Sequence, residues 1–453
     1  MGTPSIPPDS SLPLIESLAR TESALRPASR DLVEHCLVRI SDPNGEGART
    51  FLSVWEDAAR TAADAVDAFS RVGYSASAIA GVPISIKDLL DVKGEVTRAA
   101  ARPLDDAPPA PQDAPVVRRL RAAGAVLLGR TNMTPFAYSV VGLNGHFGTP
   151  ANPADPARTP GGSSSGAAVS VATGMAMAAI GSDTVGSIRV PAALCGVVGM
   201  KPTQRRVPLA GAVPLSASLD SIGPLARSVE DCARVLAVLA EEALPPWRRT
   251  RTEGLRLALP NRPLLDGLDA TVARAFGRAC HRLSEAGAHL RERHFCELDE
   301  LADGQLMRTI QSVEAYTWHE PLLARRGGDY EPRIRTRIER GRDIRSADYA
   351  RALQRRAALI ASFAGEMSEV DALILPTVPV VAPTFAECEA DEDSVRTRLL
   401  RNTASFNVLD ACAVTLPIHE PGNLPVGLML VAQSGRDWDL LDIAHAVEDA
   451  LRT

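Results

Sequence analysis

Residues 160–203 constrain this chain more than any other part of it. The stretch holds two turns rich in glycine and serine, 160–166 and 181–189, separated by the small apolar residues 167–180. Glycines beside a serine let backbone N–H groups turn toward a substrate oxygen, as an oxyanion hole requires. A serine needs a base to act as a nucleophile, but neither turn contains a histidine. The stretch therefore predicts serine chemistry without a Ser-His-Asp triad.

The flanking pattern is typical of an α/β protein. Residues 81–88 are expected to form a short buried strand, 116–123 an amphipathic helix and 125–128 the strand that follows it. The small residues 167–180 suit a tightly packed central helix. This alternation of strands and helices predicts an α/β sheet.

Composition excludes several classes of protein. The net charge of −6 argues against a nucleic-acid or acidic-membrane surface. The seven cysteines are odd in number and lack ligand spacing, so we expect no disulfide framework, no metal site and a cytoplasmic location. The first eleven residues lack the basic and apolar regions of a secretory signal. No motif calls for a cofactor.

The 160–203 stretch resembles the signature of the amidase signature family. The upstream run Gly-Val-Pro-Ile-Ser-Ile-Lys-Asp at 81–88 matches the lysine strand of that family, and 218–224 matches a later segment. The close resemblance covers residues 80–232, and a weaker one covers 371–448. It implies a mixed central β-sheet covered by helices on both sides, with a helical cap.

The resemblance also implies roles for individual residues. Ser187 matches the nucleophile, Ser163 the bridging serine that follows a cis peptide bond, and Lys87 the terminal base. The oxyanion hole of the family matches the backbone N–H groups of Thr184, Val185, Gly186 and Ser187. Its supporting positions match Ser164, Asp183 and Arg189. A loop that faces the substrate in the family matches Phe136, Ala137 and Tyr138.

The lysine role can be argued from chemistry as well. A lysine accepts a proton only when it is neutral, so near neutral pH its pKa must lie about 2–3 units below about 10.4. Burial shifts a lysine pKa in that direction. Neutral Lys87 would then take a proton from Ser163, as Ser163 takes one from Ser187.

Two positions depart from the family pattern. Val185 stands where most members have glycine, and a β-branched residue resists positive φ. The family's C-terminal Gly-x-Pro appears as Asp410-Ala411-Cys412. Asp410 either meets a polar substrate group in the pocket or is a change in a surface loop.

We expect a single domain over residues 1–453. Its parts would be N-terminal helices at 1–72, a catalytic core at 80–232, a helical cap at 296–368 and a return to the sheet at 371–453. The expected function is hydrolysis of a non-peptide C–N bond in a small amide, aryl amide or carbamate, with esterase or urethanase activity open. The protein would act as a monomer or homodimer. The alternatives are an amidotransferase A subunit that releases ammonia from glutamine for a partner enzyme, and a binding protein without activity.

Overall fold

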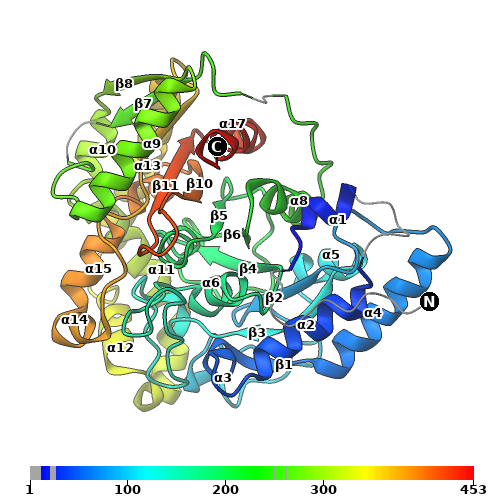
Figure 1. Ribbon diagram of the computed structural model, residues 1–453. Helices are drawn as coiled ribbons and strands as arrows, with labels where there is room; N and C mark the ends of the chain where they lie inside the picture. The colour runs from blue at the N-terminus through cyan, green and yellow to red at the C-terminus, as the bar shows by residue number, and fades with distance from the viewer. Residues whose placement is uncertain (1–11, 21–26, 249–250, 261–262, 453) are drawn as a thin grey trace.

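The centre of the fold is one eleven-stranded sheet (Figure 1). The computed structural model describes residues 12–20, 27–248, 251–260 and 263–452, so the first eleven residues and the expected absence of a signal there lie outside it. The strand order across the sheet is β1 (Phe51–Val54), β3 (Val126–Thr131), β2 (Pro83–Lys87), β4 (Ala178–Asp183), β6 (Ser221–Ala226), β5 (Val198–Lys201), β10 (Cys412–Pro417), β11 (Gly427–Ala432), β9 (Ala372–Pro376), β7 (Arg256–Pro260) and β8 (His289–Arg293).

Strand direction decides where the site can lie. Strand β2 runs between β3 and β4 and is parallel to both, whereas β4, β6, β5, β10, β11 and β9 pair antiparallel in turn. The carboxyl ends of β2, β3 and β4 therefore meet at one edge, where α/β sheets usually bind ligands. Every residue of β2 is buried, as expected for a central strand.

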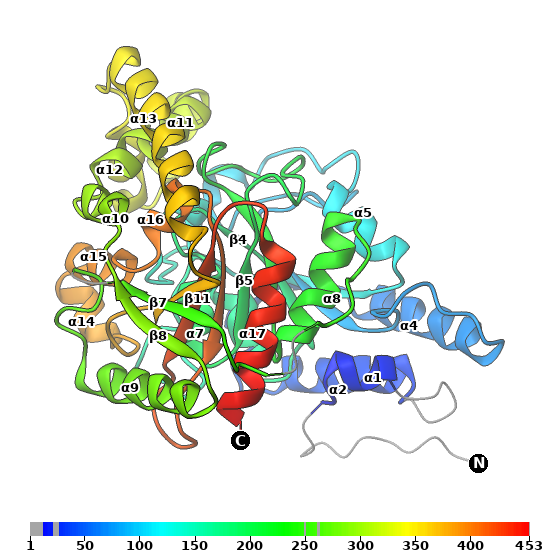
Figure 2. The same cartoon turned by 90° about the horizontal axis from the view of Figure 1, so that it is seen from above.

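Helices cover both faces of the sheet (Figure 2). On one face, α6 (Ser165–Ala172) and α7 (Arg189–Cys195) pack with Ala179 and Leu225. On the other, α8 (Val229–Ala240) and α17 (Asp437–Arg452) share a core with Ala178 and Ile180. Side chains of successive strand residues point to opposite faces, which accounts for this division. The expected mixed α/β sheet is confirmed.

The segment 296–367 is helical, and its helices lie together beside the sheet (Figure 2). It consists of α10 (Cys296–Leu301), α11 (Gln305–Arg326), α12 (Pro332–Glu339) and α13 (Ser346–Met367), and we call it the cap. The other helices are α1 (Ile15–Arg20), α2 (Ser29–Ser41), α3 (Gly47–Thr50), α4 (Glu56–Arg71), α5 (Pro115–Ala122), α9 (Ala270–Glu285), α14 (Phe385–Ala390), α15 (Glu392–Leu400) and α16 (Ala404–Val408).

Two expectations about local structure are wrong. The N-terminal segment 1–72 is not purely helical, because Phe51–Val54 pairs antiparallel with β3. The predicted helix at 167–180 ends at Ala172, where Gly174 adopts a φ of 70°, and strand β4 begins at Ala178. Glycine takes this left-handed conformation at no steric cost, so it ends the helix and frees the chain to enter the sheet.

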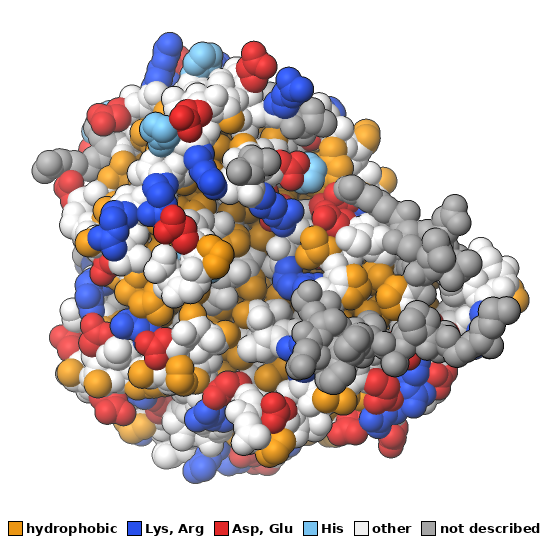
Figure 3. All heavy atoms as spheres, viewed as in Figure 1, with side chains coloured by type: hydrophobic (Ala, Val, Ile, Leu, Met, Phe, Trp, Pro, Cys, Tyr) orange, Lys and Arg blue, Asp and Glu red, His pale blue; other side chains and the backbone are white. Residues whose placement is uncertain are grey.

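The surface carries charges of both signs. On the face shown in Figure 3, acidic and basic side chains are interspersed rather than separated into fields of one sign. Within the described ranges, we find no helix with the length and apolar character needed to cross a membrane.

Candidate active site

Three segments bring the predicted triad to the carboxyl edge of the sheet. Lys87 is the last residue of β2, Ser163 lies just before α6, and Ser187 lies between β4 and α7. Because β2 and β4 are parallel neighbours, their ends are adjacent. All three side chains are fully buried. The peptide bond between Gly162 and Ser163 is cis, as the resemblance implied.

Lys87 is surrounded by hydroxyl groups rather than by carboxylates. Its Nζ donates to Ser163 Oγ at 2.7 Å, Ser164 Oγ at 2.9 Å and Ser182 Oγ at 2.9 Å. Burial lowers the pKa of Lys87 to about 7, although the more distant carboxylates of Asp183 and Asp220 act in the opposite direction. A large fraction of Lys87 is therefore neutral at physiological pH, as a general base requires.

Ser187 lies close to this cluster without joining its hydrogen bonds. The Ser164 N–H donates to the Ser187 carbonyl at 3.2 Å, which ties the two serine turns together. Ser187 Oγ is buried and makes no hydrogen bond with any described residue. The geometry thus links Lys87 to Ser163, and it leaves the Ser187 hydroxyl without a partner beside them.

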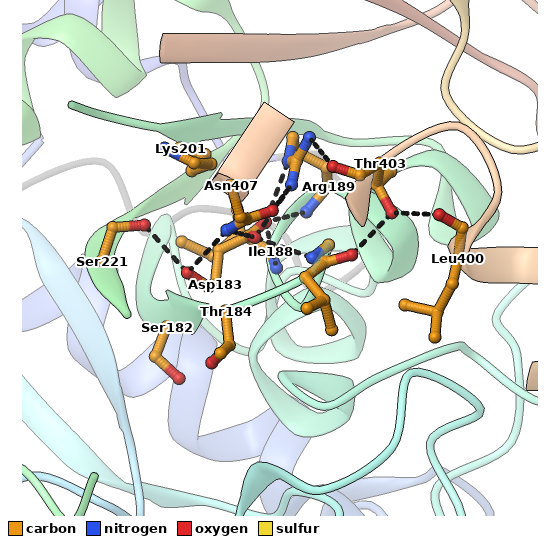
Figure 4. A network of polar contacts seen from close by, with 12 residues as sticks. Ser182, Asp183, Thr184, Ile188, Arg189, Lys201, Ser221, Leu400, Thr403 and Asn407 are labelled. Carbon is orange, nitrogen blue, oxygen red and sulfur yellow. Dashed lines mark hydrogen bonds and ion pairs between the residues drawn. The ribbon is translucent and has the colours of Figure 1, made fainter. Parts of the chain in front are cut away.

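A buried charge network holds the Ser187 turn (Figure 4). Asp183 accepts hydrogen bonds from the Arg189 side chain at 3.0 Å through both carboxylate oxygens. Asn407 Nδ2 donates to Asp183 Oδ1 at 2.9 Å, and Arg189 Nη2 donates to Asn407 Oδ1 at 2.6 Å. Burial by itself would raise the pKa of Asp183, but Arg189 lowers it well below its usual range. Arg189 Nη1 also donates to the Thr403 carbonyl at 3.2 Å, and we call Asp183, Arg189, Thr403 and Asn407 the brace.

The brace also uses one of the predicted oxyanion donors. The Gly186 N–H donates to Asp183 Oδ1 at 2.7 Å, so it serves the turn itself. The backbone N–H groups of Thr184, Val185 and Ser187 stay predictions for the oxyanion hole.

Comparison with known proteins shows the family of the chain. The family model described as Amidase matches residues 31–441. The chain belongs to the amidase family. Its members are hydrolases that act on C–N bonds.

Relatives of this amidase-family chain have different activities. It is 36% identical to a 2-amino-5-chloromuconic acid deaminase from Comamonas testosteroni, over 87% of each chain. It is 32% identical to the A subunit of a glutamyl-tRNA(Gln) amidotransferase from Koribacter versatilis, over 93% of this chain and 94% of that one. A solved structure described as an amidase has a TM-score of 0.87 at 33% identity, covering 96% of this chain and 99% of that one.

The two departures from the amidase pattern have structural explanations. Val185 is not among the residues with positive φ, so its position does not require glycine, and its carbonyl accepts from Thr403 Oγ1 at 2.7 Å. Gly186 has a φ of 134°, and a Cβ there would lie 2.4 Å from Thr403 Oγ1. Asp410 accepts from Gln204 N at 2.9 Å and Ser434 Oγ at 3.0 Å, so it joins two loops.

A cavity of about 290 Å³ adjoins this site on the side of the residue 209–217 loop, and Lys87, Ser163 and Ser187 are not among the residues that line it. Its polar wall is formed by Ser182, Thr184 and Asp220. Its apolar wall is formed by Leu89, Ala137, Leu209, Ala210, Ala212, Val213, Pro214, Leu215, Ala217 and Ile222. We call residues 209–217 the cavity wall.

The predicted substrate loop contributes unevenly to this cavity. Ala137 lines it. Phe136 instead stacks on Tyr330, with ring centroids 5.2 Å apart, and the Tyr138 hydroxyl donates to the Arg337 carbonyl at 3.4 Å. Both aromatic side chains thereby fasten the cap to the core.

Four residues around the site were not predicted as site residues. Ser182 contacts Lys87, Thr403 and Asn407 belong to the brace, and Asp220 lines the cavity. Ser182 could have been found from its position beside Asp183 at the end of a strand, whereas no local pattern marks Thr403 or Asn407. In the part of the chain that the structure describes, no group of three or more His, Cys, Asp or Glu side chains is placed to hold a metal ion.

Proposed function

We propose that this chain hydrolyses small non-peptide amides through an acyl-enzyme on Ser187. Lys87 is the base, Ser163 carries the proton between the two, and Thr184 and Val185 supply backbone donors to the oxyanion. The single observation that supports this most is the contact of a buried lysine, whose pKa is lowered to about 7, with Ser163 Oγ at 2.7 Å.

Protons are conserved over the two steps, formation of the acyl-enzyme and its hydrolysis. In the charged form Nζ donates to Ser163, but neutral Lys87 has a lone pair, so this contact reverses: Ser163 donates its hydroxyl proton to Nζ and accepts the proton of Ser187. Ser187 Oγ attacks the carbonyl carbon and forms a tetrahedral oxyanion. The proton on Lys87 then returns through Ser163 to the leaving nitrogen, and the amine departs. Water repeats the relay and releases the acid.

The cavity favours a compact, largely apolar group on the substrate. Ten of the residues that line the cavity are apolar, and Asp220 is the ionisable residue of the lining. A carboxylate on the substrate would be repelled by Asp220, and the cavity lining contains no lysine or arginine to bind it. Glutamine carries such a carboxylate, so the cavity favours a neutral amide over the amidotransferase alternative. That alternative is kept because its A subunits are 32–34% identical to this chain.

A substrate panel tests this proposal. Purified protein is assayed with anilides, aryl carbamates and aryl esters of the same short acyl chains, and with glutamine for ammonia release. We expect the anilides to be hydrolysed with a neutral acyl group and glutamine to be left intact. Release of ammonia from glutamine at a higher kcat/KM than from any neutral amide would reverse the choice. The ratio among anilide, carbamate and ester decides whether urethanase or esterase activity accompanies it.

A further inference from the structure

One carboxylate of the cap is hydrogen-bonded to the cavity wall and to the residue that follows it. Glu314, on α11, accepts hydrogen bonds from the hydroxyls of Ser216 and Ser218 and, at 3.0 Å, from the Ser218 backbone N–H. The Tyr349 hydroxyl, on α13, donates to it as well, at 2.7 Å. Ser216 and Ser218 flank Ala217, which lines the cavity. Two cap helices thus meet the wall at a single side chain.

The same loop continues to the predicted oxyanion turn. Asp220 Oδ2 accepts from the backbone N–H groups of Leu215 at 2.9 Å and Ser216 at 3.0 Å. Its other oxygen accepts from Thr184 Oγ1 at 2.6 Å. An unbroken path of hydrogen bonds and a short loop therefore runs from Glu314 through Ser216 and Asp220 to Thr184.

We propose that Glu314 is a positioning residue that sets both the acyl-length selectivity of the cavity and the placement of Thr184. The inference rests on the proposed function for its kinetic consequences. Ala217 and Leu215 form part of the wall that an acyl group would meet, so a shift of the loop changes the space available. The backbone of Thr184 would supply an oxyanion donor, so a shift there lowers the rate of acyl transfer.

Replacement of Glu314 by glutamine isolates the carboxylate from the size of the side chain. All four donors that face Glu314 are neutral, and each oxygen receives two of them. Glutamine can still accept the Ser218 N–H through its one oxygen, but its NH2 group then faces the hydroxyls of Ser218 and Tyr349, which must rotate from donating to accepting. The charge that strengthens all four hydrogen bonds is lost, so the loop is held more weakly. Glu320→Gln is the matched control, because Glu320 is exposed on the same helix.

The kinetic test compares acetyl, butyryl and hexanoyl 4-nitroanilides. We expect Glu314→Gln to lower kcat about tenfold, since small misplacements near a reacting centre are costly. The hexanoyl-to-acetyl ratio of kcat/KM should change by about tenfold, a size typical of pocket discrimination. Glu320→Gln should change neither. Tyr349→Phe, which keeps the carboxylate and removes one donor, should shift the ratio in the same direction by less, and it serves if Glu314→Gln does not fold.

Hydrogen exchange gives a reading that does not depend on turnover. Glu314→Gln should exchange faster than wild type in peptides that cover residues 209–221 and 184–187, with Glu320→Gln unchanged. Unchanged exchange at 184–187 together with an unchanged selectivity ratio would overturn the inference and leave the proposed function standing. If wild type hydrolyses none of the substrates, the proposed function fails, and exchange at 184–187 still decides whether Glu314 positions the turn.

Discussion

The brace and Asp220, which also binds the cavity wall, hold neighbouring parts of the same turn by opposite means. Asp183, in the brace, faces the permanently charged guanidinium of Arg189, which lowers its pKa. Asp220, which lines the cavity, is held by one hydroxyl and two backbone N–H groups, and burial raises its pKa to about 6. The turn is thus fixed on one side by a charge pair and on the other by a carboxylate that titrates close to neutrality.

The two carboxylates of this site therefore differ in whether their charge can change with pH. An ion pair buried on all sides keeps its charge across the working range of pH, so the Ser187 end of the turn has one geometry. Neutral donors around a carboxylate allow its charge to change, and they connect that carboxylate to the cavity wall. Burial lowers the pKa of Lys87, and the carboxylates of Asp183 and Asp220 both raise it against that effect.

The largest expected effect comes from removing the nucleophile, which leaves both regions intact. Ser187→Ala deletes a hydroxyl that makes no hydrogen bond with the described residues. Loss of a serine nucleophile costs on the order of 10⁴-fold or more in kcat. Initial rates on the best substrate of the panel measure it, and Ser170→Ala, a buried serine on α6, is the control. Near wild-type turnover by Ser187→Ala would remove the triad assignment.

The next effect concerns Lys87, where the two regions act together. Lys87→Ala and Lys87→Arg should each lower kcat by about 10³-fold, because arginine stays protonated and cannot serve as a base. In the wild type, kcat/KM should fall as pH drops through about 7, when Lys87 gains a proton. Asp220→Asn should move this midpoint downward, since one carboxylate that favours the charged lysine is lost. Substantial activity in Lys87→Arg would show that lysine acts as a positive charge.

Stability should separate the two carboxylates. Asp183→Asn leaves Arg189 buried without its counter-charge, and breaking such a pair costs about 3–5 kcal/mol of unfolding free energy. Asp220→Asn breaks no ion pair, so we expect a smaller loss, about 1–2 kcal/mol from its hydrogen bonds. Urea unfolding at pH 7.5 followed by circular dichroism measures both. Equal losses would mean that the ion pair of the brace stabilises the fold no more than the hydrogen bonds of Asp220 do.

The pH dependence of stability sharpens the same contrast. Asp220 has a folded pKa of about 6, above its unfolded value of about 3.9, so it adds stability below about pH 4 that is lost as pH rises through 6. The unfolding free energy of wild type relative to Asp220→Asn should therefore fall by on the order of 2–3 kcal/mol between pH 4 and pH 7. The corresponding difference for Asp183→Asn should have the opposite sign. A flat difference for Asp220 would mean that its pKa is not raised.

The smallest expected effect is that of a chelator. Neither region needs a metal in the proposed reaction, so activity should stay within about 10% of its starting value after exhaustive dialysis against EDTA. Rates before and after dialysis, with and without added zinc or manganese, give the answer. Loss of activity that a metal restores would require a different account of the site.

Local sequence patterns mark part of the site, and contacts between segments far apart in the sequence form the rest. The resemblance to the amidase signature implies the roles of Lys87, Ser163 and Ser187, and the local patterns that carry it are an apolar strand before the lysine and glycine-rich turns around the serines. Thr403, Asn407 and Glu314 reach the site from segments with no local mark, so only the fold shows their roles. Strand β1 was missed because its four residues lie among helices, and β4 because small apolar residues suit a helix and a central strand equally.

The brace has a consequence for how activity arises during synthesis. Lys87, Ser163 and Ser187 have all left the ribosome long before Thr403 and Asn407 are made, yet these two residues contact the nucleophile turn through Val185, Asp183 and Arg189. A nascent chain that ends near residue 390 holds the whole triad but lacks what shapes it. Such a fragment should be inert, so the cell is not exposed to a half-made hydrolase, and splitting the gene before residue 400 would give two pieces that act only together.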